Sequence, residues 1–297
     1  FLPLTFTRPI SELRVGILTI KEKWEKYLNI SISYYTMEYL QKKYPLFSDN
    51  QNIFINSTIL PEKNLIDEIN NLKKNEFLTY HNIVIAANTG SETIKELKID
   101  NLKEFKQINS KIQKIKKINY PWDLFLLNGD EIFSDFELIT SGRTSNKISE
   151  TNIILGKGNI FLEDGAKCEA SVLNTTNGPI YIGRNAEIME GSLIRGPLAL
   201  CDNSIIKMGA KIYGPTTIGP SSKAGGEINN SIIFGYSNKA HDGFIGQSII
   251  GEWCNLGADT NASNLKNTYA NVKIWNYRTM SFIDTGIQFC GLIMGDH

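Results

Sequence analysis

The first half of the chain alternates between helical and strand patterns. Apolar or aromatic side chains recur at roughly helical spacing in two segments, and two β-branched runs are bounded by turn residues, as buried strands are. The helical segments are residues 18–28 and 36–44, and the strand runs are residues 52–60 and 81–88. The mixture predicts an α/β domain over residues 1–140, in which residues 120–140 form a final strand, a turn and a connecting segment.

The second half has a period of six. Aliphatic residues recur in one register, and a small residue follows four positions after nearly every one of them. The aliphatic positions are Ile182, Ile188, Ile194, Leu200, Ile206, Ile212 and Ile218, and the second set is Ala186, Ser192, Leu198, Ser204, Ala210, Thr216 and Ser222. This hexapeptide repeat predicts an all-β domain over residues 141–297, a parallel β-helix. The aliphatic side chains should fill its interior, while the small residues allow the corners.

The six-residue spacing slips between Lys223 and Ile250, and we expect a loop that leaves the β-helix there and carries His241. An interruption of a regular solenoid sacrifices packing, which favours another use for the segment. A histidine exchanges protons near pH 7 and suits the role of a general base. The alternative is that His241 simply caps a turn, and the local residues by themselves favour this alternative over the general base.

Other polar residues of the same region are ambiguous by themselves. Lys223 and Lys239 are candidates to hold a phosphate or a sugar hydroxyl, but an isolated lysine is more often simply solvated. Asn255 and Asn264 lie nine residues apart and carry amides that both donate and accept hydrogen bonds, which suits a sugar or an amide-bearing cofactor. Asparagine is also common at β-helix corners.

Composition narrows the class of partner. The 31 basic residues balance the 31 acidic ones, so no net positive field favours nucleic acid or an anionic membrane surface. The sequence has no run of about 18 apolar residues and no signal-peptide pattern at its start, which predicts no membrane insertion and a cytoplasmic location. The chain lacks an initial Met and stops within an apolar pattern, so we expect truncation at both ends.

The cysteines and histidines argue against a metal site. Cys168, Cys201, Cys254 and Cys290 are widely spaced without a C-x-x-C pair, and we expect reduced, buried thiols. A zinc hydrase site on a β-helix needs three histidine ligands. The chain has three histidines in all, and they lie in different regions.

Two longer segments carry a family resemblance. Residues 237–267, SNKAHDGFIGQSIIGEWCNLGADTNASNLKN, resemble the acetyltransferase half of the bifunctional glucosamine-1-phosphate acetyltransferase and N-acetylglucosamine-1-phosphate uridyltransferase family. Residues 2–28 and 178–200 resemble more narrowly its alternate bacterial form, a sugar nucleotidyltransferase. The resemblance implies a left-handed β-helix, a homotrimer with active sites between subunits, and a role in making UDP-N-acetylglucosamine for the cell envelope.

The resemblance also assigns roles. It makes His241 the base that deprotonates the amine of glucosamine 1-phosphate before attack on acetyl-CoA, with Glu227, fourteen residues earlier, as its supporting carboxylate. Phe244 stands where the family has a substrate-binding tyrosine. Three further positions match the family: Asn255 for the sugar, and Ala258 and Asn264 for acetyl-CoA. Lys223 corresponds to a residue that grips the sugar phosphate, and Lys239 remains a second candidate for substrate binding.

The match has departures. One residue is missing between Lys239 and His241, Leu265 replaces a tyrosine, and Asn229 and Asn230 replace two basic residues. The acceptor sugar and its phosphate are therefore open.

The start of the chain, LPLTFTRP, resembles the segment after the glycine-rich loop of sugar nucleotidyltransferases, whose amides cradle nucleotide phosphates. That loop would precede residue 1. Arg8 and Arg14 are the nearby cations for the nucleotide phosphates. Asp130, in LNGDEI, imitates the family's magnesium aspartate, although we interpret this stretch as a turn. Mg²⁺ is expected only if this reduced nucleotidyltransferase-like domain is active.

Two functions follow. The first is acetyl transfer from acetyl-CoA to an amino-sugar 1-phosphate on the β-helix, with nucleotidyl transfer to a sugar 1-phosphate on the α/β domain. The alternative is a nucleotidyltransferase-like protein whose β-helix only trimerises it or binds a regulator.

Overall fold

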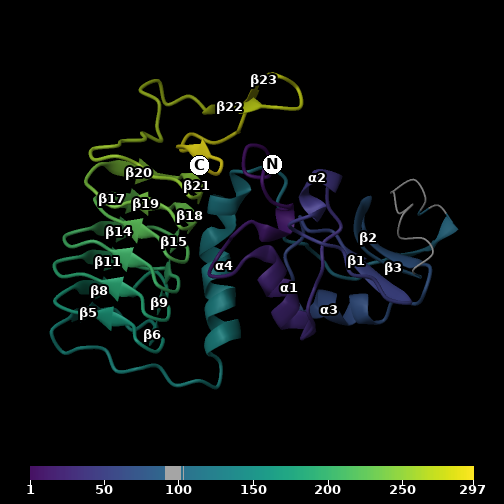
Figure 1. Cartoon of the computed structure of the whole chain (residues 1–297), viewed down its shortest axis with the longest axis horizontal. Coiled ribbons are helices and arrows are strands. Elements are labelled where there is room, and N and C mark those ends of the chain that lie inside the picture. The colour runs from purple at the N-terminus through teal and green to yellow at the C-terminus, as the bar shows by residue number, and fades with distance from the viewer. Residues whose placement is uncertain (91–101, 103) are drawn as a thin grey trace. The chain divides into compact units, whose positions relative to one another are not determined.

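The computed structural model describes residues 1–90, 102 and 104–297, and within them the chain forms two compact units (Figure 1). The first unit comprises Phe1–Thr7, Leu13–Thr19 and Tyr120–His297, and the second comprises Arg8–Glu12 and Ile20–Asn119. The division at Asn119 precedes the boundary that the change of pattern predicts at residue 140, because the helix after Tyr120 belongs with the first unit.

The second unit is a small α/β structure. Its four-stranded sheet has the order β1-β3-β2-β4, in which β3 is antiparallel to β1 and β2, and β4 is parallel to β2. Trp24 of α1 is buried and donates from Nε1 to the carbonyl of Ile59 at 3.0 Å. The elements are η1 (Ile10–Glu12), α1 (Ile20–Leu28), α2 (Glu38–Gln41), β1 (Gln51–Ile55), α3 (Lys63–Asn70), β2 (Glu76–Tyr80), β3 (Ile83–Gly90) and β4 (Lys106–Asn109). The predicted α/β class, helices and strands are confirmed.

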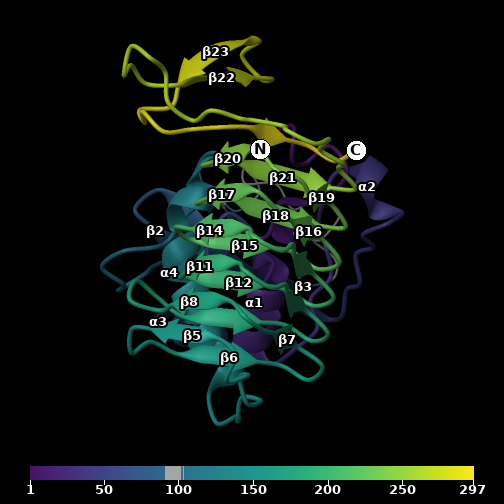
Figure 2. The same ribbon diagram turned by 90° about the vertical axis from the view of Figure 1, so that its left-hand side faces the viewer.

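The first unit is a parallel β-solenoid with one long helix, α4 (Asp123–Thr140), along it (Figures 1 and 2). Its strands stack into three parallel faces. The first face has β7 (Lys167–Cys168), β10 (Glu187–Ile188), β13 (Ile205–Ile206), β16 (Lys223–Ala224) and β19 (Asn238–Lys239). The second has β5 (Ile153–Leu155), β8 (Val172–Asn174), β11 (Leu193–Arg195), β14 (Lys211–Tyr213), β17 (Glu227–Asn229) and β20 (Phe244–Gly246). The third has β6 (Ile160–Leu162), β9 (Ile180–Ile182), β12 (Leu198–Leu200), β15 (Thr216–Ile218), β18 (Ile232–Gly235), β21 (Ile249–Glu252) and β24 (Ile293–Met294).

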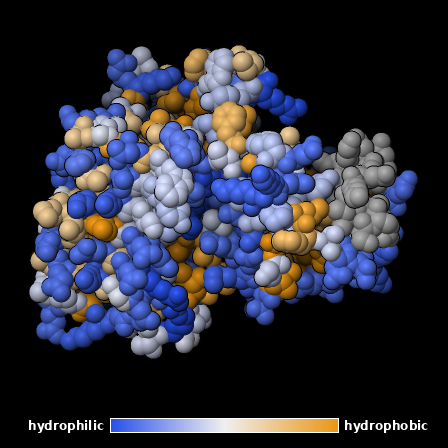
Figure 3. Space-filling view, viewed as in Figure 1, coloured by the Kyte–Doolittle hydropathy of each residue, from blue (hydrophilic) through white to orange (hydrophobic). Residues whose placement is uncertain are grey.

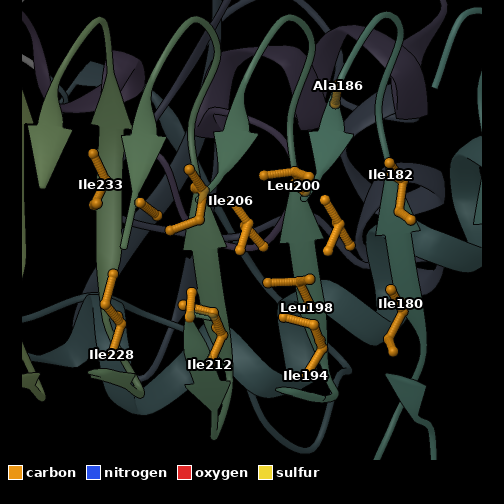
Figure 4. Packing of buried hydrophobic residues seen from close by; sticks show 14 of the residues in the cluster. Ile180, Ile182, Ala186, Ile194, Leu198, Leu200, Ile206, Ile212, Ile228 and Ile233 are labelled. Carbon is orange, nitrogen blue, oxygen red and sulfur yellow. The ribbon is translucent and has the colours of Figure 1, made fainter. Parts of the chain in front are cut away.

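The interior of the solenoid confirms the hexapeptide interpretation. All seven aliphatic positions of the repeat are at most 2% exposed, and the residues four positions later are fully buried. Figure 4 shows members of this interior, among them Ile182, Ile194, Leu200, Ile206 and Ile212, pointing inward from successive coils, whereas the outer surface of the coils in Figure 3 is predominantly hydrophilic. The interior is thus a continuous aliphatic column whose burial stabilises the fold by about 1.5 to 3 kcal/mol per side chain.

Residues 120–140 correct one prediction, because they form the helix α4 rather than a strand and a turn. The Asn-Gly-Asp sequence is typical of turns. Here Asn128 is buried, accepting from the amide of Gly16 at 2.7 Å and donating to the carbonyl of Pro215 at 3.0 Å. A Cβ at position 129 would lie 2.9 Å from Cγ of Pro215, so Gly129 permits the close approach of helix and solenoid. Tertiary packing overrides the local turn preference.

The helix α4 covers the third face. Ile132 and Phe136 of α4 share an apolar cluster with Phe161, Tyr181 and Ala199 of that face. Asp135 accepts hydrogen bonds from the amides of Ile17 and Leu18 at 2.8 and 3.0 Å, which fixes the segment Leu13–Thr19 beside the helix. The helix and this segment are therefore integral to the solenoid unit.

The predicted loop around His241 is not present. The coil continues through β16, β17, β18, β19, β20 and β21 without an excursion. The spacing slips because the coils shorten. Lys223 pairs with Asn238 in the next coil, and these two partners are closer in sequence than Glu187 and Ile205, which pair in the same way earlier on this face. His241 lies in a tight turn, residues 240–243, at the corner between β19 and β20.

The true excursion comes later. Residues 266–288 leave the solenoid between the bridge partners Leu265 and Phe289, and they contain the antiparallel hairpin of β22 (Lys273–Asn276) and β23 (Ser281–Asp284). Figures 1 and 2 show this hairpin projecting beyond the last coils. The chain then returns as β24, where Ile293 pairs with Ile249.

All four cysteines are buried free thiols, as predicted. Burial raises the pKa of Cys168 to about 12 and that of Cys290 to about 11, so both are protonated at neutral pH. These thiols act as small apolar residues.

Candidate functional site

Glu227 and Phe244 face outward from adjacent coils. They are register partners on β17 and β20, and Lys211 of β14 is the partner of Glu227 in the coil before. These three residues, with Asp242, Asp259 and Asn261, line an open cavity of about 340 Å³, and glycines at the coil corner complete its wall. The solenoid therefore groups into one surface cavity residues that are distributed over fifty positions of sequence.

The carboxylate of Glu227 is anchored by Tyr213, a residue that the sequence reasoning missed. The Tyr213 hydroxyl donates to Oε1 of Glu227 at 2.6 Å. This hydrogen bond, with burial and the negative charge of Glu227, raises the pKa of Tyr213 to about 12. Since Lys211 pairs with Glu227 and Tyr213 with Asn229, Tyr213 lies diagonally across from Glu227. Extending the coil register would have identified it.

His241 lies beside this cavity. A Cβ added to Gly226 would lie 2.9 Å from the carbonyl oxygen of His241 and 2.9 Å from Cα of Asp242. The backbone of turn 240–243 thus rests directly on the residue that precedes Glu227. The His241 side chain is exposed, and within the described chain no hydrogen bond joins its imidazole to Glu227.

Lys223 and Asn255 lie across the corner from the cavity. Lys223 pairs with Asn238, and Asn238 forms a parallel bridge with Asn255, so the two candidates are two coils apart in one column of the first face. Both are exposed. The turn that carries His241 separates this column from Glu227 and Phe244.

Ala258 and Asn264, the two positions matched to acetyl-CoA, lie in the coil that follows the one carrying His241 and Phe244. Ala258 is exposed in a turn, next to Asp259, whose amide donates to the carbonyl of Asp242 at 3.0 Å. Asn264 donates from its side chain to the side-chain oxygen of Gln247 in the coil below. Its carbonyl accepts from the amide of Cys290 at 2.9 Å, where the chain returns from its excursion.

Lys239 departs from its predicted role. Its side chain is fully buried, and its ammonium donates to the carbonyls of Gly225 at 3.2 Å, Asp242 at 3.1 Å, and His241. Burial lowers the pKa of Lys239, and the negative charges of Asp242 and Asp259 partly oppose this effect. An ammonium held by three backbone carbonyls does not project toward a substrate, contrary to the expectation from sequence.

The arginines proposed for nucleotide phosphates are not exposed cations. Arg14 donates to the carbonyl of Phe234 at 3.3 Å and to that of Ile17, within the first unit. Arg8, in the second unit, is only 3% exposed. Asp130 lies on the exposed side of α4 rather than in a turn. Phosphate binding by either arginine would require a rearrangement of these side chains.

Neither a metal cluster nor a membrane span is found in the part of the chain that the structure describes. No group of three or more His, Cys, Asp or Glu side chains there is arranged to hold a metal ion. No helix in the same residues is long and apolar enough to cross a membrane.

Comparison with known proteins supplies the remaining observation. Residues 1–144 match the family model for sugar nucleotidyl transferase. No curated protein matches the chain. The sugar nucleotidyltransferase-like region thus takes in the second unit together with α4, while the solenoid strands lie outside the match. The match supports a transferase that acts on small sugar phosphates and nucleotides.

Proposed function

We propose that the protein is a sugar-nucleotide biosynthesis enzyme that transfers an acetyl group from acetyl-CoA to an amino-sugar 1-phosphate on the solenoid. The observation that carries this proposal is the pairing of Glu227 with Phe244 over one cavity, immediately beside the turn of His241. Nucleotidyl transfer to a sugar 1-phosphate, with Mg²⁺, is proposed for the amino-terminal region, on the strength of its family match.

In the proposed reaction, His241 removes a proton from the amino group of the acceptor. The amine nitrogen then attacks the thioester carbonyl, a C–N bond forms, and the C–S bond breaks. The thiolate of coenzyme A leaves and takes up the proton from the imidazolium. One proton is therefore moved from amine to thiol, and no oxidant or reductant is needed.

Glu227 would stabilise the imidazolium of His241 through its negative charge, while the hydrogen bond from Tyr213 keeps the carboxylate in place. The ring of Phe244 supplies an apolar wall beside the acceptor. Lys223 and Asn255 would bind the phosphate and hydroxyl groups across the corner. Ala258 and Asn264, in the coil above, would contact acetyl-CoA, which delivers the activated acetyl group.

The charges around the cavity influence which groups of the acceptor sugar can bind in it. Glu227, Asp242 and Asp259 contribute carboxylates, and Lys211 contributes the cation. This lining attracts an amino group but repels a phosphate. A sugar 1-phosphate would therefore have to place its phosphate away from the carboxylates, toward Lys223.

The proposed assembly is a homotrimer with a left-handed solenoid, acting in the cytoplasm in the supply of UDP-N-acetylglucosamine to the cell envelope. The assembly, the handedness and the pathway rest on the resemblance of residues 2–28, 178–200 and 237–267, and the location rests on the absence of a run of about 18 apolar residues in the sequence.

A second function is favoured by a different observation. The family match ends at residue 144, and α4, the last helix within it, packs on the third face of the solenoid. Because the solenoid strands lie outside this match, the match assigns no activity to the solenoid, as would be the case for a solenoid that only trimerises a nucleotidyltransferase-like domain or binds a regulator.

An assay of the purified chain with acetyl-CoA and glucosamine 1-phosphate separates the two functions. We expect release of free thiol, and we expect His241→Ala to lower turnover by about 10²- to 10⁴-fold. His81→Ala, outside the solenoid, is the matched control and should leave turnover unchanged.

Absence of thiol release by the wild-type chain, with glucosamine 1-phosphate or with unphosphorylated glucosamine, would favour the scaffold. Normal turnover by His241→Ala would remove His241 from the mechanism.

A further inference from the structure

Lys239 occupies a position that the solenoid otherwise reserves for apolar side chains. Following the register of the first face, Cys168 pairs with Ile188, Ile188 with Ile206, Ile206 with Ala224, and Ala224 with Lys239. Leu256 follows in the next coil, one residue after the bridge of Asn238 and Asn255. The other members of this column are buried and apolar, so a lysine here breaks the rule that builds the fold.

Hydrogen bonds to backbone carbonyls compensate for the burial of the Lys239 ammonium. Its hydrogen bonds go to the carbonyls of Gly225, His241 and Asp242, and it makes no ion pair with a carboxylate within the described chain. An aliphatic side chain would fill the column without desolvating a charge. An aliphatic side chain could not, however, donate hydrogen bonds to the three carbonyls that face inward at this corner.

The carbonyls held by Lys239 belong to the turn that carries His241 and to the strand end beneath it. From below, Gly225 and Gly226 allow the backbone of residues 240–243 to lie in direct contact with the coil. From inside, Lys239 binds the peptide groups of His241 and Asp242. These two restraints, one from the coil below and one from the interior, explain how the turn holds its shape.

We infer that Lys239 is a positioning residue that fixes the peptide groups of His241 and Asp242, and with them the direction of the proposed base and the lining of the cavity. The link to turnover rests on the proposed function. The anchoring of the turn does not, because it can be observed in the absence of any substrate.

The decisive variant is Lys239→Met in the full chain, which keeps an unbranched side chain of similar length and removes the donors. Lys167→Met, at an exposed position of the same face, is the matched control. Hydrogen exchange reports on the turn directly, because the amides of Glu227 and Asp259 donate to the carbonyls of Gly243 and Asp242 at 3.1 and 3.0 Å. We expect exchange at these two amides to rise roughly tenfold or more in Lys239→Met.

The amide of Leu193, which donates to Ala210 in the regular coils, should not change. A uniform rise at all three amides would indicate a purely structural role and would overturn the inference, as would a variant that exchanges like Lys167→Met. In the acetyl-transfer assay, kcat of Lys239→Met should fall by about 10- to 100-fold while KM for acetyl-CoA stays nearly constant.

If Lys239→Met does not fold, a measurement on a chain that keeps Lys239 can still test whether this residue anchors the turn. Lys23 and Lys239 are both buried, so selective ¹⁵N labelling of lysine side chains in a Lys23→Met background should still reveal an ammonium whose protons are protected from exchange at neutral pH. The absence of such a signal would overturn the anchoring. Should the wild-type chain transfer no acetyl group, the proposed function fails, while the exchange measurements still test the anchored turn.

Discussion

The regular and the shortened coils of the solenoid differ in period and in what they bury. From Glu187 to Lys223 each coil advances the register by three hexads, and the interior of this part is apolar. Beyond Lys223 the pairings of β16 with β19, β17 with β20 and β18 with β21 join residues that are closer in sequence than three hexads, and a lysine enters the interior. The candidate site lies in the shortened part.

This difference has a physical reason. Three hexads complete one coil in the regular part, and each position repeats its environment, which selects for uniform packing. In the shortened part the carbonyls of Gly225, His241 and Asp242 point inward at one corner, where the ammonium of Lys239 binds them. Inward-facing carbonyls require polar hydrogen-bond donors at this corner, and polar groups are also what a binding site needs to hold a ligand. Three changes of sequence test this comparison.

The largest effect is expected in the regular coils. Ile206→Asp places a carboxylate in the aliphatic column without a partner, and it should destabilise the solenoid by more than about 4 kcal/mol or prevent folding. Circular dichroism with thermal unfolding measures this. Ile205→Asp, one residue earlier on the outward side of β13, is the matched control and should change stability by no more than about 1 kcal/mol. Equal unfolding temperatures for the two variants would contradict the inward column.

A smaller effect should test the close contact between turn 240–243 and the coil before it. Gly226 and Gly209 both have positive φ, +69° and +72°. Alanine in this conformation costs about 1 to 2 kcal/mol at either position. At Gly226 the new Cβ would also meet backbone atoms at 2.7 to 2.9 Å, whereas at Gly209 nothing lies within 4 Å. Denaturant unfolding should show Gly226→Ala to be less stable than Gly209→Ala by a further 1 to 3 kcal/mol or so, and a pair of equal stability would refute the close contact.

The smallest effect concerns pH and the first coils. Arg143 donates to both carboxylate oxygens of the buried Glu163, at 2.5 and 2.8 Å, and Tyr181 donates to one of them at 3.0 Å. Burial alone would raise the pKa of Glu163, but these hydrogen bonds outweigh it and lower the pKa below its usual range. The stabilisation is therefore present above about pH 4.3, the unfolded value, and is lost as the pH falls through the folded pKa.

Glu163→Gln should remove this dependence and cost on the order of 1 kcal/mol at neutral pH. Unfolding measured between pH 3 and 7 should thus give a flatter acid limb for the variant than for the wild-type chain. Parallel curves would show that Glu163 does not contribute to acid sensitivity.

Structural features could be predicted from the sequence where the pattern of apolar and small residues is regular. The aliphatic column could be predicted because the same environment recurs every six residues, and all seven positions are buried. In contrast, the prediction of a strand and turn at α4 was wrong, because Asn128 and Gly129 meet tertiary demands from Gly16 and Pro215 that no local preference reveals.

The candidate site shows the same division. Glu227 and Phe244 were identified by resemblance, and the register brings them together. Tyr213 was missed because its contact with Glu227 spans two coils, and Lys239 is buried although an isolated lysine is usually solvated. The expected loop at His241 was wrong because a slipped period has two interpretations, an insertion or a shorter coil, and only backbone pairing distinguishes them.

Composition and periodicity were therefore sufficient for the α/β region, the parallel solenoid, its apolar interior and the buried thiols, since these depend on patterns that repeat along the chain. The place of α4, the shortened coils, the excursion at residues 266–288 and the buried ammonium of Lys239 required three-dimensional packing. Each of these four features depends on contacts between residues far apart in sequence. The free energy of burying one residue depends on the residue that it contacts, and the sequence around either residue does not reveal that contact.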